Sequence, residues 1–149
     1  AGFRRLAEHI LGAVASGQDP GRGGGLPRVL SGTAWAFAKL CCEDIPLIDA
    51  LAAEALCHLH EFEPQDISAT AWSWAKMLVV NLPLFDSMSV PVLRDISAYP
   101  SHDLSSTAWA FSKLLVLDCP LRDAIAVHAV CNISEYDPAG LTNIAWAWA

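Results

Sequence analysis

Tryptophan and lysine recur along the chain at one spacing, and these side chains are suited to binding. Each tryptophan of the set is 37 residues from the next, and the first three are each followed four residues later by a lysine. The set consists of Trp35, Trp72, Trp109 and Trp146 with Lys39, Lys76 and Lys113. An indole can stack on a base or fill space between helices, and an ammonium can pair with a phosphate or with a helix C-terminus. We expect the tryptophans to be largely buried between repeats, with Trp146 more exposed, and both roles stay open for the lysines.

Residue patterns for catalysis and metal binding are absent from the sequence. His58 and His60 are two residues apart, so a helix directs them to different sides. His128 and Cys131 share a helical face but supply only two of the four ligands of a closed zinc site. The glycine-rich run at 17–25 has neither the Gly-Lys-Ser/Thr ending nor the preceding strand of a phosphate-binding loop. The sequence therefore predicts no enzyme, no metal site and no cofactor.

The composition indicates a folded chain without a membrane span. Of the 149 residues, 54% are hydrophobic and 17% are charged, which is too apolar for a disordered protein. The apolar runs are far shorter than the roughly 20 residues that a bilayer span requires. The net charge of -7 opposes long-range attraction to phosphate, so any reading as a nucleic-acid binder must overcome it.

A repeat of 37 residues organises the chain. The sequence around each recurring tryptophan agrees in four segments, namely 30–40 (LSGTAWAFAKL), 67–77 (ISATAWSWAKM), 104–114 (LSSTAWAFSKL) and 141–149 (LTNIAWAWA). Prolines at 46, 83 and 120 and aromatic residues at 62, 99 and 136 recur at the same step. We therefore divide the array 26–149 into units at about 27–63, 64–100, 101–137 and, in part, 138–149. Residues 1–25 are predicted to be a helix of a partial preceding repeat and a glycine-rich loop.

Each unit is predicted to contain two antiparallel helices, so the fold class is all-α, an α-solenoid of helix pairs. In the second unit the first helix is expected at about 67–79, with Asp66 as its N-cap. The second helix of each unit follows an Asp-x-Pro or Asn-x-Pro connection and ends at the recurring aromatic residue. Pro91 is expected to kink the second helix of its unit or to delay its start. Because the sequence stops within a helical pattern at Ala149, we expect a longer protein and self-association through the open end.

One strip of each first helix varies while the residues around it repeat. At about 100° per residue, positions 28, 32 and 39 lie opposite the apolar face. Their counterparts give the candidate binding residues Arg28, Gly32, Lys39, Gln65, Ala69, Lys76, His102, Ser106, Lys113 and Asn143. The segments 30–42, 67–79, 104–116 and 141–149 contain no acid, so every acid is expected elsewhere and this surface to be weakly positive. A constant frame with a variable strip suits a modular reader of a polymer.

Four sequence features together form one pattern. They are the motif Leu-x-x-Thr-Ala-Trp-Ala-Phe-Ala-Lys-Leu, the Asp-x-Pro-Leu connection, a second helix that ends in Ile-Ser-Glu-Tyr, and the entry Pro-Gln-Asp-Ile to the next unit. This pattern resembles octatricopeptide-repeat proteins and related organellar RNA-processing proteins with leucine-rich helical repeats. The resemblance implies import into chloroplast or mitochondrion, binding of single-stranded RNA, and support of transcript stability, processing or translation. It also implies that the first helices face the RNA. Ile144, where the other units have threonine, and Pro91 depart from the pattern.

The sequence thus predicts a single-stranded RNA-binding segment in which lysines contact phosphates and the variable positions meet bases. The alternative is a scaffold that holds a protein partner, a helix or an extended peptide, which the net negative charge favours. A spacer that contributes only length and rigidity is a third reading.

Overall fold

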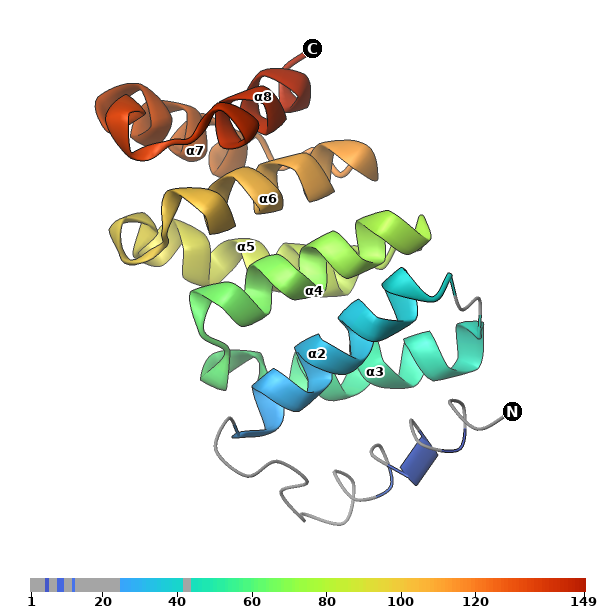
Figure 1. Ribbon diagram of the computed structural model, residues 1–149. Coiled ribbons are helices and arrows are strands. Elements are labelled where there is room, and N and C mark those ends of the chain that lie inside the picture. Colours follow the sequence, from blue (N-terminus) through green and yellow to red (C-terminus); the bar gives the residue numbers. More distant parts are fainter. Residues whose placement is uncertain (1–4, 6–7, 10–11, 13–24, 42–43) are drawn as a thin grey trace.

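The computed structural model describes residues 5, 8, 9, 12, 25–41 and 44–149 (Figure 1). Within this part the chain forms helices and no strands, as predicted. The α-helices are α2 (Gly25–Lys39), α3 (Ile45–His58), α4 (Pro64–Met77), α5 (Leu82–Arg94), α6 (Ser101–Lys113), α7 (Cys119–Cys131) and α8 (Pro138–Ala147). Short 3-10 helices follow three of them, namely η1 (Leu59–Glu61), η2 (Ile96–Ala98) and η3 (Ile133–Glu135). The helix and loop predicted for residues 1–25 lie almost entirely outside the described residues.

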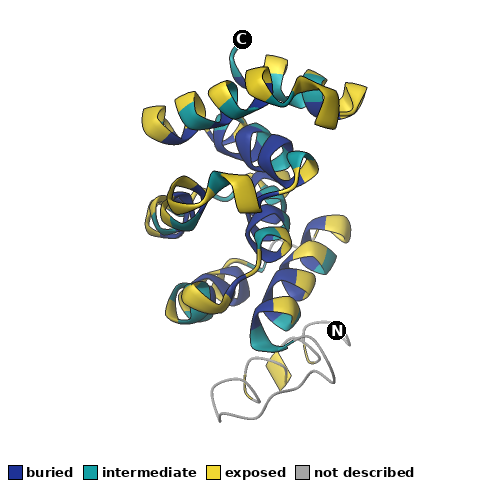
Figure 2. Ribbon diagram, turned by 90° about the vertical axis from the view of Figure 1, so that its left-hand side faces the viewer, coloured by how far each residue is buried: buried dark blue, intermediate teal, exposed yellow. Residues whose placement is uncertain are grey.

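The helices form two layers. The first helices α2, α4, α6 and α8 lie side by side in chain order, and the second helices α3, α5 and α7 lie behind them (Figure 1). Neighbouring first helices are in contact along much of their length, whereas the second helices meet one another less extensively (Figure 2). No helix of the described ranges is both long enough and apolar enough to cross a membrane.

The connections between the two layers follow from local sequence. A proline in the first turn opens α3, α5 and α7, where its missing N–H costs no hydrogen bond. Asn81 and Asp118 cap α5 and α7 by accepting hydrogen bonds from the backbone N–H of Leu84 and Leu121, at 3.1 and 2.9 Å. The chain leaves each first helix through a residue with positive φ, a conformation that turns it away from the helix axis. These residues are 37 apart and are Cys41, Leu78 and Leu115.

Pro91 does not delay the helix that contains it. Helix α5 begins at Leu82, directly after its capping residue, and continues past Pro91 to Arg94. It is 13 residues long, the same length as α7. The proline lies in the last turn, where a missing N–H removes only one helical hydrogen bond.

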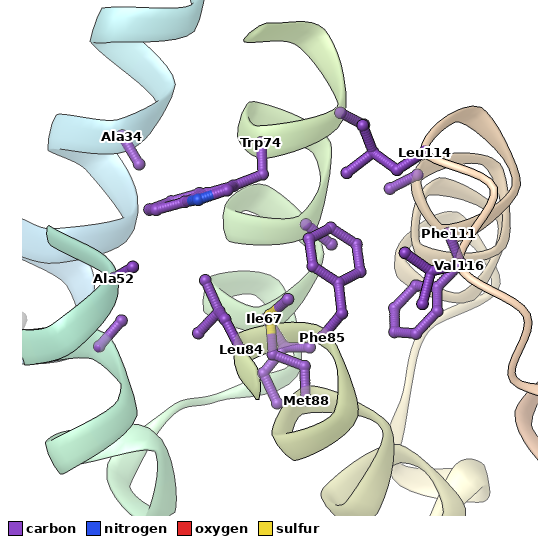
Figure 3. Close-up of a cluster of buried hydrophobic side chains, with 14 of the residues drawn as sticks. Ala34, Ala52, Ile67, Trp74, Leu84, Phe85, Met88, Phe111, Leu114 and Val116 are labelled. Carbon is purple, nitrogen blue, oxygen red and sulfur yellow. The ribbon is translucent and has the colours of Figure 1, made fainter. Parts of the chain in front are cut away.

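The aromatic column of the core lies two residues beyond the recurring tryptophans. Phe37, Trp74 and Phe111 are 0%, 1% and 5% exposed. In Figure 3, Trp74 extends from α4 toward α2 and α3, and the next layer continues with a contact between the rings of Phe85 and Phe111, whose centroids are 4.8 Å apart. Large side chains therefore reach from the second unit toward the first and from the second unit to the third.

The expectation that Trp35, Trp72 and Trp109 are largely buried is wrong. Trp35 is 47% exposed, as is Trp146, while Trp72 and Trp109 are half-buried. Two residues along a helix correspond to a rotation of about 200°, so Trp35 and Phe37 cannot both face the core. The core takes the second of the two aromatic positions, and the recurring tryptophan is left near the surface.

The beginnings of the first helices also differ from expectation. Helix α4 starts at Pro64 after Glu63, so Asp66 lies inside the first turn and is not the N-cap. The backbone N–H of Glu63 donates to Asp66 Oδ2 at 3.3 Å, and the Asp66 carboxylate is buried. Asp103 has the corresponding place in α6 and is buried as well. The expectation that no acid lies on the first helices is therefore wrong, because these helices begin earlier than the repeated motif.

Trp74 of α4 and Trp35 of α2 should differ sharply in their contribution to stability. We predict that Trp74→Ala lowers the free energy of unfolding by about 3 to 5 kcal/mol, as loss of a buried aromatic ring does. Trp35→Ala should lower it by less than about 1.5 kcal/mol, since that ring is half in solvent. Urea denaturation of both variants measures the difference, and Trp74→Phe, which restores the residue type of positions 37 and 111, should lose less than Trp74→Ala. Equal losses at positions 35 and 74 would contradict this assignment of the core.

Candidate functional site

The predicted binding positions lie on the outer face of the first helices. In each helix they follow the steps i, i+4 and i+11, with the recurring tryptophan at i+7, so one side of the helix carries all of them. Seven of the ten are exposed, namely Arg28, Gly32, Lys39, Gln65, Lys76, His102 and Lys113. The other three are partly exposed, namely Ala69, Ser106 and Asn143. We call this set, with the tryptophans between them, the variable strip.

An open groove of about 950 Å³ runs across α2, α4 and α6 along this strip. The structure brings six of the predicted residues together in its lining, namely Arg28, Gly32, Gln65, Ala69, His102 and Ser106. Trp35 and Trp72 line it as well, although we had expected them to be buried. Asn143 and the three lysines lie outside the lining. At Gly32 an added Cβ would meet no atom within 4 Å, so the groove is open at that point.

Arg28 links the first two units across the groove. Its Nη1 donates to Gln65 Oε1 at 2.7 Å, and its Nε lies 3.2 Å from Asp66 Oδ1. Two of the predicted positions are therefore bonded to each other, and the buried Asp66 carboxylate partly offsets the arginine charge. An anion that approaches this end of the groove would compete with Asp66 for the guanidinium.

Buried serine–aspartate hydrogen bonds fix how the first helices lie against one another. Ser31 Oγ donates to Asp66 Oδ1 at 2.9 Å, and Ser68 Oγ donates to Asp103 Oδ1 at 2.6 Å. Each serine also lies within hydrogen-bond distance of a carbonyl of its own helix, Ser31 Oγ 3.3 Å from that of Arg28 and Ser68 Oγ 3.1 Å from that of Gln65. The recurrence of serine at 31, 68 and 105 and of aspartate at 66 and 103 could have indicated the pairing, but the sequence motif gives no sign that the aspartates face the preceding helix.

The serine–aspartate series ends at the fourth unit. Gly140 stands where an aspartate would continue the series, and Ser105 Oγ bonds only within its own helix, to the carbonyl of His102 at 2.9 Å. A Cβ at residue 140 would lie 3.3 Å from Ser105 Oγ and 2.9 Å from Asp137 Oδ1, so the two helices approach closely here. Helix α8 is therefore joined to α6 by close packing in place of a charged hydrogen bond.

Lysine ammonium groups and tryptophan rings contact each other at the C-terminal ends of the first helices. Lys39 Nζ lies 5.2 Å from the centroid of the Trp35 ring and 5.3 Å from that of Trp72. Lys113 Nζ lies 5.9 Å from the Trp146 ring. Such contacts are attractive because the face of an indole is electron-rich. Sequence reasoning offered phosphate or a helix end as the lysine partner and missed the rings, of which Trp72 and Trp146 belong to the unit that follows the lysine.

The histidines and cysteines that the structure describes do not assemble a metal site. His128 Nδ1 lies 3.0 Å from the hydroxyl of Tyr136, and burial raises the pKa of that tyrosine. Among the residues that the structure describes, no three His, Cys, Asp or Glu side chains come together in a way that could hold a metal ion. The variable strip and its groove are therefore the best-defined candidate site.

No protein-family model matches this chain, and a comparison with curated proteins finds no match either. The function is therefore inferred from the geometry of the groove and from the sequence pattern.

The buried Ser68–Asp103 bond should contribute measurably to stability. We predict that Asp103→Ala lowers the free energy of unfolding by about 1.5 to 3 kcal/mol, the range for a buried hydrogen bond to a charged group. Asp123→Ala on α7 is the matched control, since Asp123 is exposed, and should change it by less than about 1 kcal/mol. Urea denaturation measures both. Similar small effects of the two substitutions would show that the junction between α4 and α6 does not depend on this bond.

Proposed function

We propose that this chain is a segment of an α-solenoid with a 37-residue repeat that binds single-stranded RNA along the variable strip. As the resemblance implies, the protein would act in chloroplast or mitochondrion and support the stability, processing or translation of particular transcripts. The layer of adjacent first helices supports the solenoid, as does the recurrence of positive φ at Cys41, Leu78 and Leu115. The proposed activity is binding and involves no reaction.

The observation that carries the proposal is the lining of the groove. Six of the positions that differ between units line it, together with the recurring Trp35 and Trp72, while the repeated aromatic positions 37, 74 and 111 pack the core. Each of the first three units contributes a different pair to the lining, Arg28 with Gly32, Gln65 with Ala69, and His102 with Ser106. Guanidinium, amide, imidazole and hydroxyl groups are the side chains that distinguish base edges by hydrogen bonding.

The charges on the first helices oppose RNA binding less than the net charge of -7 implies. Asp103 lines the groove and Asp66 lies in the first turn of α4, and both are buried and hydrogen-bonded, so they project little field into solvent. Glu63, at the N-cap of α4, is the exposed acid of the lining. The exposed Lys39, Lys76 and Lys113 lie in the last turns of α2, α4 and α6. Three ammonium groups in a row are spaced by the repeat and can follow the phosphates of an extended strand.

The salt dependence of RNA binding tests the lysine row. If each lysine neutralises one phosphate, the logarithm of the affinity should fall with the logarithm of salt concentration at a slope of about -2, since each contact contributes about -0.7. Lys76→Gln should make this slope less steep by about 0.7, the contribution of one phosphate contact. Arg94→Gln on α5 is the control, because Arg94 is equally exposed but lies in the layer of second helices. The measurement is a titration of a labelled, unstructured RNA at several salt concentrations.

Substitution of the variable positions should change the base preference of RNA binding and not its salt dependence. His102→Ala should change which base is preferred in one register and leave the salt slope unchanged, because base contacts specify and phosphate contacts position. RNA binding that is absent at low salt, or unchanged when all three lysines are replaced, would reject the proposal.

A second candidate function is a protein-interaction solenoid. It is favoured by an apolar groove of about 330 Å³ between α6, α7 and α8, whose lining includes Phe111, Leu121, Ile125 and Trp146. A groove of this kind suits the apolar face of a partner helix. Failure of RNA binding in the titration above would make this the better account.

A further inference from the structure

We infer that Trp35 and Trp72 form a slot for one nucleobase, and that the Lys39 ammonium occupies this slot when no RNA is bound. The inference rests on the proposed function and goes beyond it, because it assigns a stacking site to two residues that repeat between units. Neither tryptophan belongs to the variable positions that would read base edges.

The Lys39 ammonium lies over the rings of both tryptophans. Lys39 Nζ is nearly equidistant from the two indoles, at 5.2 and 5.3 Å from their centroids, although they belong to different units. Both rings line the open groove, and Trp35 is 47% exposed. A ring face that attracts an ammonium also stacks on a base, which offers a larger flat surface than an ammonium does. An incoming base therefore meets two indole faces that are separated by a flexible side chain.

Space beside the rings is provided by small residues. Gly32 and Ala69 lie one helical turn before Trp35 and Trp72, where the later units have Ser106 and Asn143. The position of the missing Gly32 side chain is open, with no atom within 4 Å of an added Cβ. A base can therefore approach the indoles from the groove without displacing the helices.

The corresponding pair at the other end of the strip is closed. The ring centroids of Trp109 and Trp146 are 6.2 Å apart with an angle of 38° between the planes, so these indoles contact each other directly. Lys113 Nζ contacts the Trp146 ring at 5.9 Å, so the lysine lies beside the pair. The slot is therefore assigned to the first two units, and the Trp109–Trp146 pair supplies an internal comparison.

Entry of a base would release the lysine for a second role. The four-carbon stem of lysine allows its ammonium to move from the ring faces to the phosphate of the stacked nucleotide. Trp35, Trp72 and Lys39 would then hold one nucleotide by its base and its phosphate. Gly32 and Ala69, at the edge of the slot, are the positions at which a larger side chain would exclude the base.

The test compares RNA with an oligomer that has no bases. Wild-type protein and the variants Trp35→Ala, Trp72→Ala and Trp35→Phe are titrated with a short labelled RNA of random sequence and with an abasic ribose-phosphate strand of equal length. The alanine variants should lose roughly 5- to 150-fold in affinity for the RNA, the effect of removing one base-stacking aromatic residue. Their affinity for the abasic strand and their salt slope should not change, and Trp35→Phe should retain much of the RNA affinity. Leu93→Ala, which removes an exposed apolar side chain from α5 in the layer of second helices, should bind RNA like the wild type.

A variant that keeps both indoles distinguishes loss of the slot from misfolding caused by removal of a tryptophan. Gly32→Leu fills the open space beside Trp35, is compatible with the helix, and should weaken RNA binding without weakening abasic binding. The slot would be rejected if the wild type bound RNA and the abasic strand with equal affinity. It would also be rejected if Gly32→Leu and Trp35→Ala bound RNA as tightly as the wild type. Either result would leave the proposal of RNA binding intact. Absence of binding to either strand would instead reject the proposed function.

Discussion

The packing of each first helix against the next is the constraint on which the rest of the structure depends. Phe37, Trp74 and Phe111 fill successive units of the core, and Trp74 reaches from α4 toward α2 and α3 (Figure 3). Buried hydrogen bonds from Ser31 and Ser68 to the aspartates of the following helix fix the lateral position of the helices. The side of a helix that packs against its neighbours cannot also face solvent. This packing therefore also determines which residues of the first helices remain in solvent.

The variable strip is a direct consequence of that arrangement. Once the core face and the serine–aspartate face are occupied, the side of the first helices that carries positions 28, 32, 35 and 39 is left outward. Neighbouring helices lie close enough for side chains of adjacent units to touch, as Arg28 and Gln65 do. A ligand that follows the strip therefore meets pairs of neighbouring units, and the Trp35–Lys39–Trp72 contact is the clearest example.

Features that depend on one helix were predictable from the sequence, and features that depend on the contact between two helices were not. Periodicity predicts the helical content and the outward position of Arg28 and Lys39. Helix-end signals predict the connections before α3, α5 and α7. The exposure of Trp35 was missed, because two aromatic residues compete for the core and only packing against the next helix decides between them. The burial of Asp66 and Asp103 was missed for a similar reason, since their serine partners lie on the preceding helix. The contact of Lys39 with two rings likewise needs the spacing between helices, which the sequence pattern does not contain.

The central claim is that RNA lies along the first helices, and photo-crosslinking tests it most directly. A single-stranded RNA carrying a photoreactive uridine is crosslinked to the protein, and the modified peptides are identified by mass spectrometry. The account predicts crosslinks in peptides from α2, α4 and α6, concentrated at the groove residues around Trp35, Trp72 and His102. Crosslinks confined to α3, α5 and α7, or distributed evenly over both layers, would contradict it.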